Sequence, residues 1–121
     1  MTIHEGSCHC GAVHFQIEAD VALVIDCNCS ICTKKGIVHV PVKDEHFTLT
    51  AGDDSLSVYT FGSGDARHWF CRRCGIHTHG RPRSAPERYT VNARCLDSFT
   101  DVVAAASVRE FDGVNHPKDE I

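Results

Sequence analysis

Clustered cysteines constrain the fold of this chain more than any other feature. Seven of its eight cysteines form three tight groups, namely Cys8 and Cys10, Cys27, Cys29 and Cys32, and Cys71 and Cys74. Thiolates one or two residues apart can turn their sulfurs toward one metal ion, and zinc prefers four tetrahedral ligands. Two pairs can complete a closed site, which leaves the CxCxxC group with three ligands and a free position for water or substrate. The spacing therefore indicates one structural and one reactive metal.

Disulfide bonds are the main alternative, because eight cysteines could form four of them. The sulfurs of a CxC pair are too close to bridge each other without strain, and disulfide-rich scaffolds are usually shorter than this chain. The first six residues also lack the basic region and apolar stretch of a secretory signal. We therefore expect zinc ligation in a cytoplasmic, reducing compartment.

Length and charge limit the other possibilities. A chain of 121 residues predicts one domain, here residues 3–115, followed by a loose tail at 116–121. Its apolar runs are shorter than the ~20 residues that span a bilayer, so no membrane partner is expected. The formal charge of −4 argues against nucleic-acid binding. Seven arginines lie between Arg67 and Arg94 with one acid, Glu87; they can bind a small carboxylate or phosphate, or form a solvated face.

The hydrophobic pattern predicts a mainly β protein. Residues 13–18 alternate, with Val13, Phe15 and Ile17 on one face. Residues 37–43 alternate too, and Pro41 predicts an edge position or a bulge there. We expect further strands at the positions that follow: 46–50 and 55–61 as a hairpin around residues 51–54, then 66–70, and a pair at 76–80 and 88–93.

Two segments can form helices. Residues 29–35 predict one short turn ended by Gly36. Residues 102–106 are ambiguous between helix and strand, and we favour a strand late in that segment. The CxCxxC group thus lies on a local loop and short helical turn. The other two groups are separated by sixty residues between Cys10 and Cys71, so a metal that joined them would close a long loop and act structurally.

Three segments resemble the glutathione-dependent formaldehyde-activating enzyme family. They are residues 6–15 around Cys8 and Cys10, residues 27–32, and residues 70–75 around Cys71 and Cys74. Residues 30–36, 81–84 and 92–97 are similar to the branch of that family that contains centromere protein V. The resemblance extends from about Gly6 to Asn115, nearly the whole chain.

The resemblance implies a β-tent zinc-binding fold of small antiparallel sheets. It implies one structural zinc on Cys8, Cys10, Cys71 and Cys74, and a second zinc on Cys27, Cys29 and Cys32 at which the glutathione thiol and its formaldehyde adduct react. The implied activity is that of a carbon–sulfur lyase acting on S-hydroxymethylglutathione or a similar thiol adduct, with two zinc ions per chain of which the second can be labile. A noncatalytic zinc module that binds protein or thiol ligands is the alternative.

Several other side chains are candidates for the site. Cys95 is either a small buried apolar group or a further ligand or reactive thiol at the second metal. His68, His77 and His79 flank the third cysteine group and are either surface residues of strands or partners of the ligand sulfurs. Lys34 and Lys35 follow Cys32 directly; they either meet a substrate carboxylate or lie on a solvated turn. The substrate and oligomeric state are not determined by the sequence.

Overall fold

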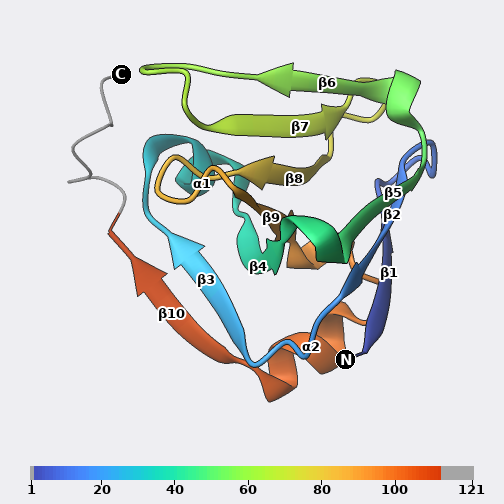
Figure 1. Ribbon diagram of the computed structural model, residues 1–121, viewed down its shortest axis with the longest axis vertical. Coiled ribbons are helices and arrows are strands. Elements are labelled where there is room, and N and C mark those ends of the chain that lie inside the picture. Colours follow the sequence, from blue (N-terminus) through green and yellow to red (C-terminus); the bar gives the residue numbers. More distant parts are fainter. Residues whose placement is uncertain (1, 113–121) are drawn as a thin grey trace.

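The computed structural model describes residues 2–112, which form two β-sheets and two short α-helices. The smaller sheet is antiparallel, in the order β1 (Ile3–Ser7), β2 (His14–Glu18), β5 (Phe47–Ala51). The larger sheet has seven strands, in the order β10 (Ser107–Phe111), β3 (Leu23–Cys27), β4 (Val38–Lys43), β9 (Arg88–Asn92), β8 (His77–Arg81), β7 (Arg67–Cys71), β6 (Leu56–Tyr59). Figure 1 shows this sheet curving from β10 and β3 round to β7 and β6, with the β1-β2-β5 sheet to one side. The prediction of a mainly β protein is confirmed.

The main core lies between the two sheets. Phe15 and Ile17 of β2 are fully buried, whereas His14 and Glu18 on the other face are exposed, as the alternation predicted. From the larger sheet, Val24, Val40, Val42 and Val91 pack into the same cluster. The opposite face of the larger sheet does not contribute to this core, and it carries the candidate site.

The predicted hairpin around residues 51–54 is wrong. β5 pairs with β2 in the smaller sheet, whereas β6 pairs with β7 in the larger one. The chain crosses between sheets at Gly52, which has φ 88°, and a Cβ there would lie 2.1 Å from the carbonyl oxygen of Ala12. This close approach leaves room for hydrogen only, so the packing of this segment against Ala12 and Val13 requires a glycine.

Pro41 does not lie on an outer strand of the sheet. β4 is flanked by β3 and β9, and Pro41 faces Thr90 of β9. On the other side, β3 pairs with Val38 and His39 alone, so the ladder has ended before Pro41. A proline without an N–H donor is tolerated because that side of β4 is unpaired at this point.

The helices agree with the sequence in one case and differ in the other. α1 (Ser30–Lys35) ends at Gly36, which has φ 66° and donates its N–H to the Cys32 carbonyl, as predicted. α2 (Phe99–Ala105) occupies most of the segment for which a strand was favoured, and β10 starts after it at Ser107. α2 buries Val102 against the core, which decides the ambiguity in favour of helix.

One strand pair is parallel, which the expectation of antiparallel sheets did not include. β10 runs parallel to β3, from Ser107 beside Leu23 to Phe111 beside Cys27. The pairing holds the end of β10 next to the Cys27 group, and the Asn28 N–H donates to the Phe111 carbonyl at 3.2 Å.

Neither helix within residues 2–112 is long and apolar enough to cross a bilayer. The expected domain end at residue 115 and the tail at 116–121 lie outside the described residues.

Candidate metal centres and an arginine-lined cavity

Four cysteines that are distant in sequence meet at the edge of the two sheets. The sulfurs of Cys8, Cys10, Cys71 and Cys74 all lie within 4.8 Å of one another. Cys8 Sγ is 3.6 Å from Cys10 Sγ, which is 3.7 Å from Cys71 Sγ. Cys8 and Cys71 are buried and Cys10 is exposed, so the group lies just beneath the surface. A single metal ion can be held by all four sulfurs.

Two tight loops present these sulfurs. In the first, the Val13 N–H donates to Cys8 Sγ at 3.3 Å and the Cys8 N–H donates to the Val13 carbonyl. In the second, the Gly75 N–H donates to the Cys71 carbonyl at 2.7 Å, and Gly75 has φ 79°. The first loop follows β1 and the second joins β7 to β8, so the group links the smaller sheet to the larger one.

The remaining three clustered cysteines form a separate group. Cys27 ends β3, Cys29 precedes α1, and Cys32 lies within α1; their sulfurs are within 4.8 Å of one another. Hydrogen bonds from the thiols of Cys27 and Cys32 lower the pKa of Cys29, and they outweigh burial, which raises it. The arrangement thus favours a thiolate at Cys29, the form that binds metal. The two groups have the membership that the sequence predicted.

His39 contacts the three-cysteine group and was not identified from the sequence. It lies on β4, is 8% exposed, and its Nε2 is 3.2 Å from Cys32 Sγ. Burial lowers the pKa of His39 to about 4, so the ring is neutral near pH 7. A neutral ring that donates from Nε2 to a thiolate would orient Cys32 and stabilise its charge. His39 itself lies outside the group of atoms that can share one ion.

A cavity of about 220 Å³ opens beside the three cysteines, on the face of the larger sheet opposite the core. Its walls include Cys27, Cys29 and Cys32, the strand residues His39, Pro41 and Thr90, and the segment 82–85 between β8 and β9. On β4 and β9 the cavity residues alternate with core residues, for example His39 with Val40 and Thr90 with Val91. Phe111 of β10 completes the wall beside Cys27.

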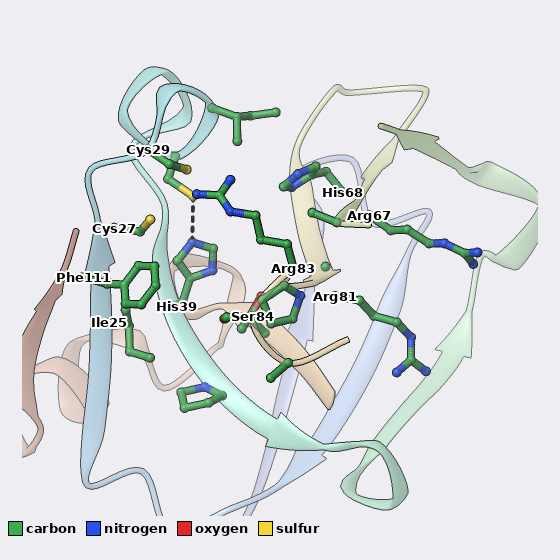
Figure 2. Close-up of a pocket in the computed structure, with 18 of the residues that line it drawn as sticks. Ile25, Cys27, Cys29, His39, Arg67, His68, Arg81, Arg83, Ser84 and Phe111 are labelled. Atoms are coloured by element: carbon green, nitrogen blue, oxygen red, sulfur yellow. Dashed lines mark hydrogen bonds between the residues drawn. The ribbon is translucent and has the colours of Figure 1, made fainter. Parts of the chain in front are cut away.

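Cationic side chains dominate the polar part of this wall. Arg67, Arg81, Arg83, Arg88 and Arg109 line the cavity, and the lining includes no acidic residue from the described part of the chain. Figure 2 shows the Arg83 side chain reaching from its loop toward the sulfurs, whereas the guanidinium groups of Arg67 and Arg81 point away from them. Arg81 binds Asp44 at 2.5 Å and lies 4.0 Å from the Tyr89 ring centre. The lining therefore carries net positive charge, which suits an anionic ligand.

The histidines near the third cysteine group differ in position. His77 and His79 are buried and His68 is half-buried, so the alternative of surface histidines is wrong. His68 and His77 line the cavity, whereas His79 packs outside it between Trp69, Phe47 and Tyr89. None of the three imidazole rings has a sulfur partner among the hydrogen bonds found in residues 2–112; the His77 ring instead contacts Lys35, at 3.2 Å.

Cys95 belongs to neither cysteine group within the described residues. It is buried in the main core, and its Sγ donates to the His77 carbonyl at 3.4 Å. Burial raises its pKa to about 12, which keeps the thiol protonated. The position agrees with a small buried apolar group rather than a ligand of the second metal.

Together the fold and site define a small β protein with two cysteine clusters that can each hold a metal ion, one of which faces a cationic cavity. The family model described as glutathione-dependent formaldehyde-activating enzyme matches residues 3–111. The chain belongs to this family. It is also similar to a Rhodobacter sphaeroides protein of known crystal structure, with 40% sequence identity and a TM-score of 0.74 over 77% of this chain and 87% of that one.

Proposed function

We propose that the protein is a zinc-dependent enzyme that makes or breaks the carbon–sulfur bond of a thiol–formaldehyde adduct such as S-hydroxymethylglutathione. The observation that carries the proposal is the opening of the three-cysteine group into an arginine-lined cavity. Family membership supports the reaction class, because the family is described by glutathione and formaldehyde.

Zinc is the metal that fits the donor sets. A tetrahedron with Zn–S bonds of ~2.3 Å has sulfurs about 3.8 Å apart, close to the 3.6 and 3.7 Å found between Cys8, Cys10 and Cys71. At the second centre, Cys27, Cys29 and Cys32 would hold the ion and leave a fourth position. Zinc bound there lowers the pKa of a thiol and keeps it as a nucleophilic thiolate near neutral pH.

The chain's own residues select the substrate. Glutathione carries two carboxylates, and an arginine pairs with a carboxylate through two parallel hydrogen bonds. Arg83 approaches the sulfur end of the cavity, while Arg88 and Arg109 supply further positive charge on its wall. Segment 82–85, Phe61 and Phe111 complete the walls of the cavity around the bound adduct.

A fourth protein ligand that closed the second centre would favour the noncatalytic alternative. Cys95, the candidate for that ligand, lies in the core and donates to a backbone carbonyl. No described residue other than the three cysteines contributes an atom to this group. The open centre therefore favours the enzyme.

The proposal is tested by measuring exchange between formaldehyde and S-hydroxymethylglutathione by NMR with zinc-loaded protein. We expect catalysis by the native protein and by Cys95→Ala, and none by Cys29→Ser. Arg83→Gln should raise KM for the glutathione adduct by about tenfold, the loss of one charge-assisted pair, and leave KM for the 2-mercaptoethanol adduct unchanged. Native, zinc-loaded protein that accelerates neither exchange would refute the proposal.

A further inference from the structure

His77 presents two ring nitrogens to different surroundings. Nδ1 lies 3.2 Å from Lys35 Nζ, and Nε2 is buried without a hydrogen-bond partner among residues 2–112. The side chain is 5% exposed and lines the cavity beside the three-cysteine group. Buried polar atoms are nearly always satisfied, so an unpaired nitrogen in a residue that lines a cavity points to a partner that the described protein atoms do not supply.

Lys35 determines which nitrogen of His77 carries the proton. It lies three residues after Cys32 on α1, so both side chains project from the same face of the helix. Its ammonium group stands behind the imidazole, outside the residues that line the cavity, and 5.8 Å from the Phe70 ring centre. An ammonium group can only donate hydrogen bonds, so Nδ1 accepts and the proton resides on Nε2.

The same surroundings keep the ring neutral. Burial, followed by the positive charge of Lys35, lowers the pKa of His77 to about 2. A neutral imidazole with its proton on Nε2 offers a hydrogen-bond donor at its unpartnered nitrogen, and it does not act as a proton acceptor there. Donors fixed in this way stabilise negative charge on an oxygen during a reaction.

We propose that His77, held in place by Lys35, donates its Nε2 hydrogen bond to the oxygen of the formaldehyde-derived carbon in the bound adduct. This inference rests on the proposed function and assigns the oxygen-binding group of the same site. When the adduct breaks down, the hydroxyl proton leaves to water, the oxygen electrons form the C=O bond, and the C–S electron pair returns to sulfur. Synthesis is the reverse. His77 gains and loses no proton in either direction.

The other cavity histidines are less suited to this role. His39 already uses Nε2 to contact Cys32 Sγ. His68 also has a buried, unpartnered Nε2, yet within the described residues no lysine or acid fixes its other nitrogen, and it stacks on Phe61 at 5.5 Å. His39 also has a buried, unpartnered nitrogen, Nδ1, but a ring that donates from Nε2 to Cys32 has no proton on Nδ1. Among these three histidines, His77 is the one whose unsatisfied nitrogen can donate.

Kinetics of His77→Phe and His77→Gln test the proposal, with His79→Phe as the control for a buried histidine outside the cavity. We expect His77→Phe to lower kcat by about 10²–10³, the usual loss for one such donor, with KM nearly unchanged. His77→Gln, which retains an N–H near the Nε2 position, should recover part of the loss. Both effects should be equal for glutathione and 2-mercaptoethanol adducts, because the oxygen comes from formaldehyde.

The tautomer is measured separately by ¹⁵N NMR of the zinc-loaded protein. We expect a protonated Nε2 and a bare Nδ1 in the native chain, and a mixture of tautomers in Lys35→Met, accompanied by a fall in kcat of about tenfold. A proton on Nδ1 in the native protein would overturn the inference, as would native kcat in a folded, zinc-loaded His77→Phe. If His77→Phe does not fold, native kcat in Lys35→Met decides against it equally. An inactive native protein would overturn the proposed function as well, whereas these results in an active protein overturn the inference alone.

Discussion

At the scale of single residues, the chemistry of the site depends on side chains that touch the cysteines rather than on the cysteines alone. His39 is the clearest example, because its ring is buried and one nitrogen meets Cys32 Sγ. A hydrogen bond to a ligand thiolate fixes the direction of the sulfur and disperses its charge. Arg83 adds positive charge from the opposite wall, as Figure 2 shows.

Replacing His39 should therefore weaken metal binding at one centre and leave the other intact. We expect His39→Phe to lower zinc affinity at Cys27, Cys29 and Cys32 by about 10–100-fold, the usual cost of losing a partner of a metal ligand. Competition with a chromophoric chelator measures both affinities in one titration. His79→Phe, a change of the same size at another buried histidine, should alter neither. Equal weakening of both centres would mean that His39 acts through general stability.

At the scale of secondary-structure elements, the site joins one short helix to one face of the larger sheet. Alternation predicted which strand residues reach the core, and it held for Phe15, Ile17, Val40 and Val42. By the same alternation, His39 lies on the opposite face of β4, and it follows Cys32 by seven residues. This placement was the sequence signal that could have identified His39 as a partner of the cysteine group. The signal was weak because a lone histidine in a strand has no characteristic spacing to its partner.

Long-range pairing is the part of the fold that local sequence does not encode. The segment 46–61 has the strand–turn–strand pattern of a hairpin, yet its strands join different sheets, and Gly52 between them lies against the backbone of Ala12. Likewise, β10 was missed because its residues are largely exposed and lack alternation. The cavity could not be predicted for the same reason, since its walls come from strands, a loop and a helix that are distant in sequence.

Gly36 gives an element-scale test, because it ends the helix that carries Cys32 and Lys35. Gly36 has φ 66°, and a Cβ at this position would meet no atom within 4 Å, so Gly36→Ala introduces backbone strain without a clash. We expect a loss of about 1 kcal/mol in unfolding free energy and weaker zinc binding at the three-cysteine centre. Gly64→Ala is the matched control: its φ is 76° and its surroundings are equally open.

Urea unfolding and chelator competition separate the two effects. Both alanine variants should lose similar stability, and only Gly36→Ala should lose zinc affinity. If Gly64→Ala weakened the same centre to the same degree, the position of α1 would not control the ligands.

At the scale of the whole molecule, the two centres have different mechanical roles. The four-cysteine group joins the loop after β1 to the turn between β7 and β8, and so connects the two sheets. The three-cysteine group spans residues 27–32 and closes only a short local loop. Binding energy at a site assembled from distant segments becomes folding energy, because the unfolded chain does not hold those ligands together.

Loss of zinc from the first centre should therefore destabilise the protein far more than loss from the second. Cys10→Ser and Cys27→Ser are a suitable pair, because Cys10 is exposed and Cys27 is half-buried, so neither change disturbs a fully buried core position. We expect Cys10→Ser to lower the unfolding free energy by roughly 3 kcal/mol or more, and Cys27→Ser by less than about 1 kcal/mol. Urea unfolding of the zinc-loaded variants, followed by the fluorescence of Trp69, measures both values. Equal losses would show that the second centre also holds the sheets together, and its zinc could then not leave the folded protein without unfolding it.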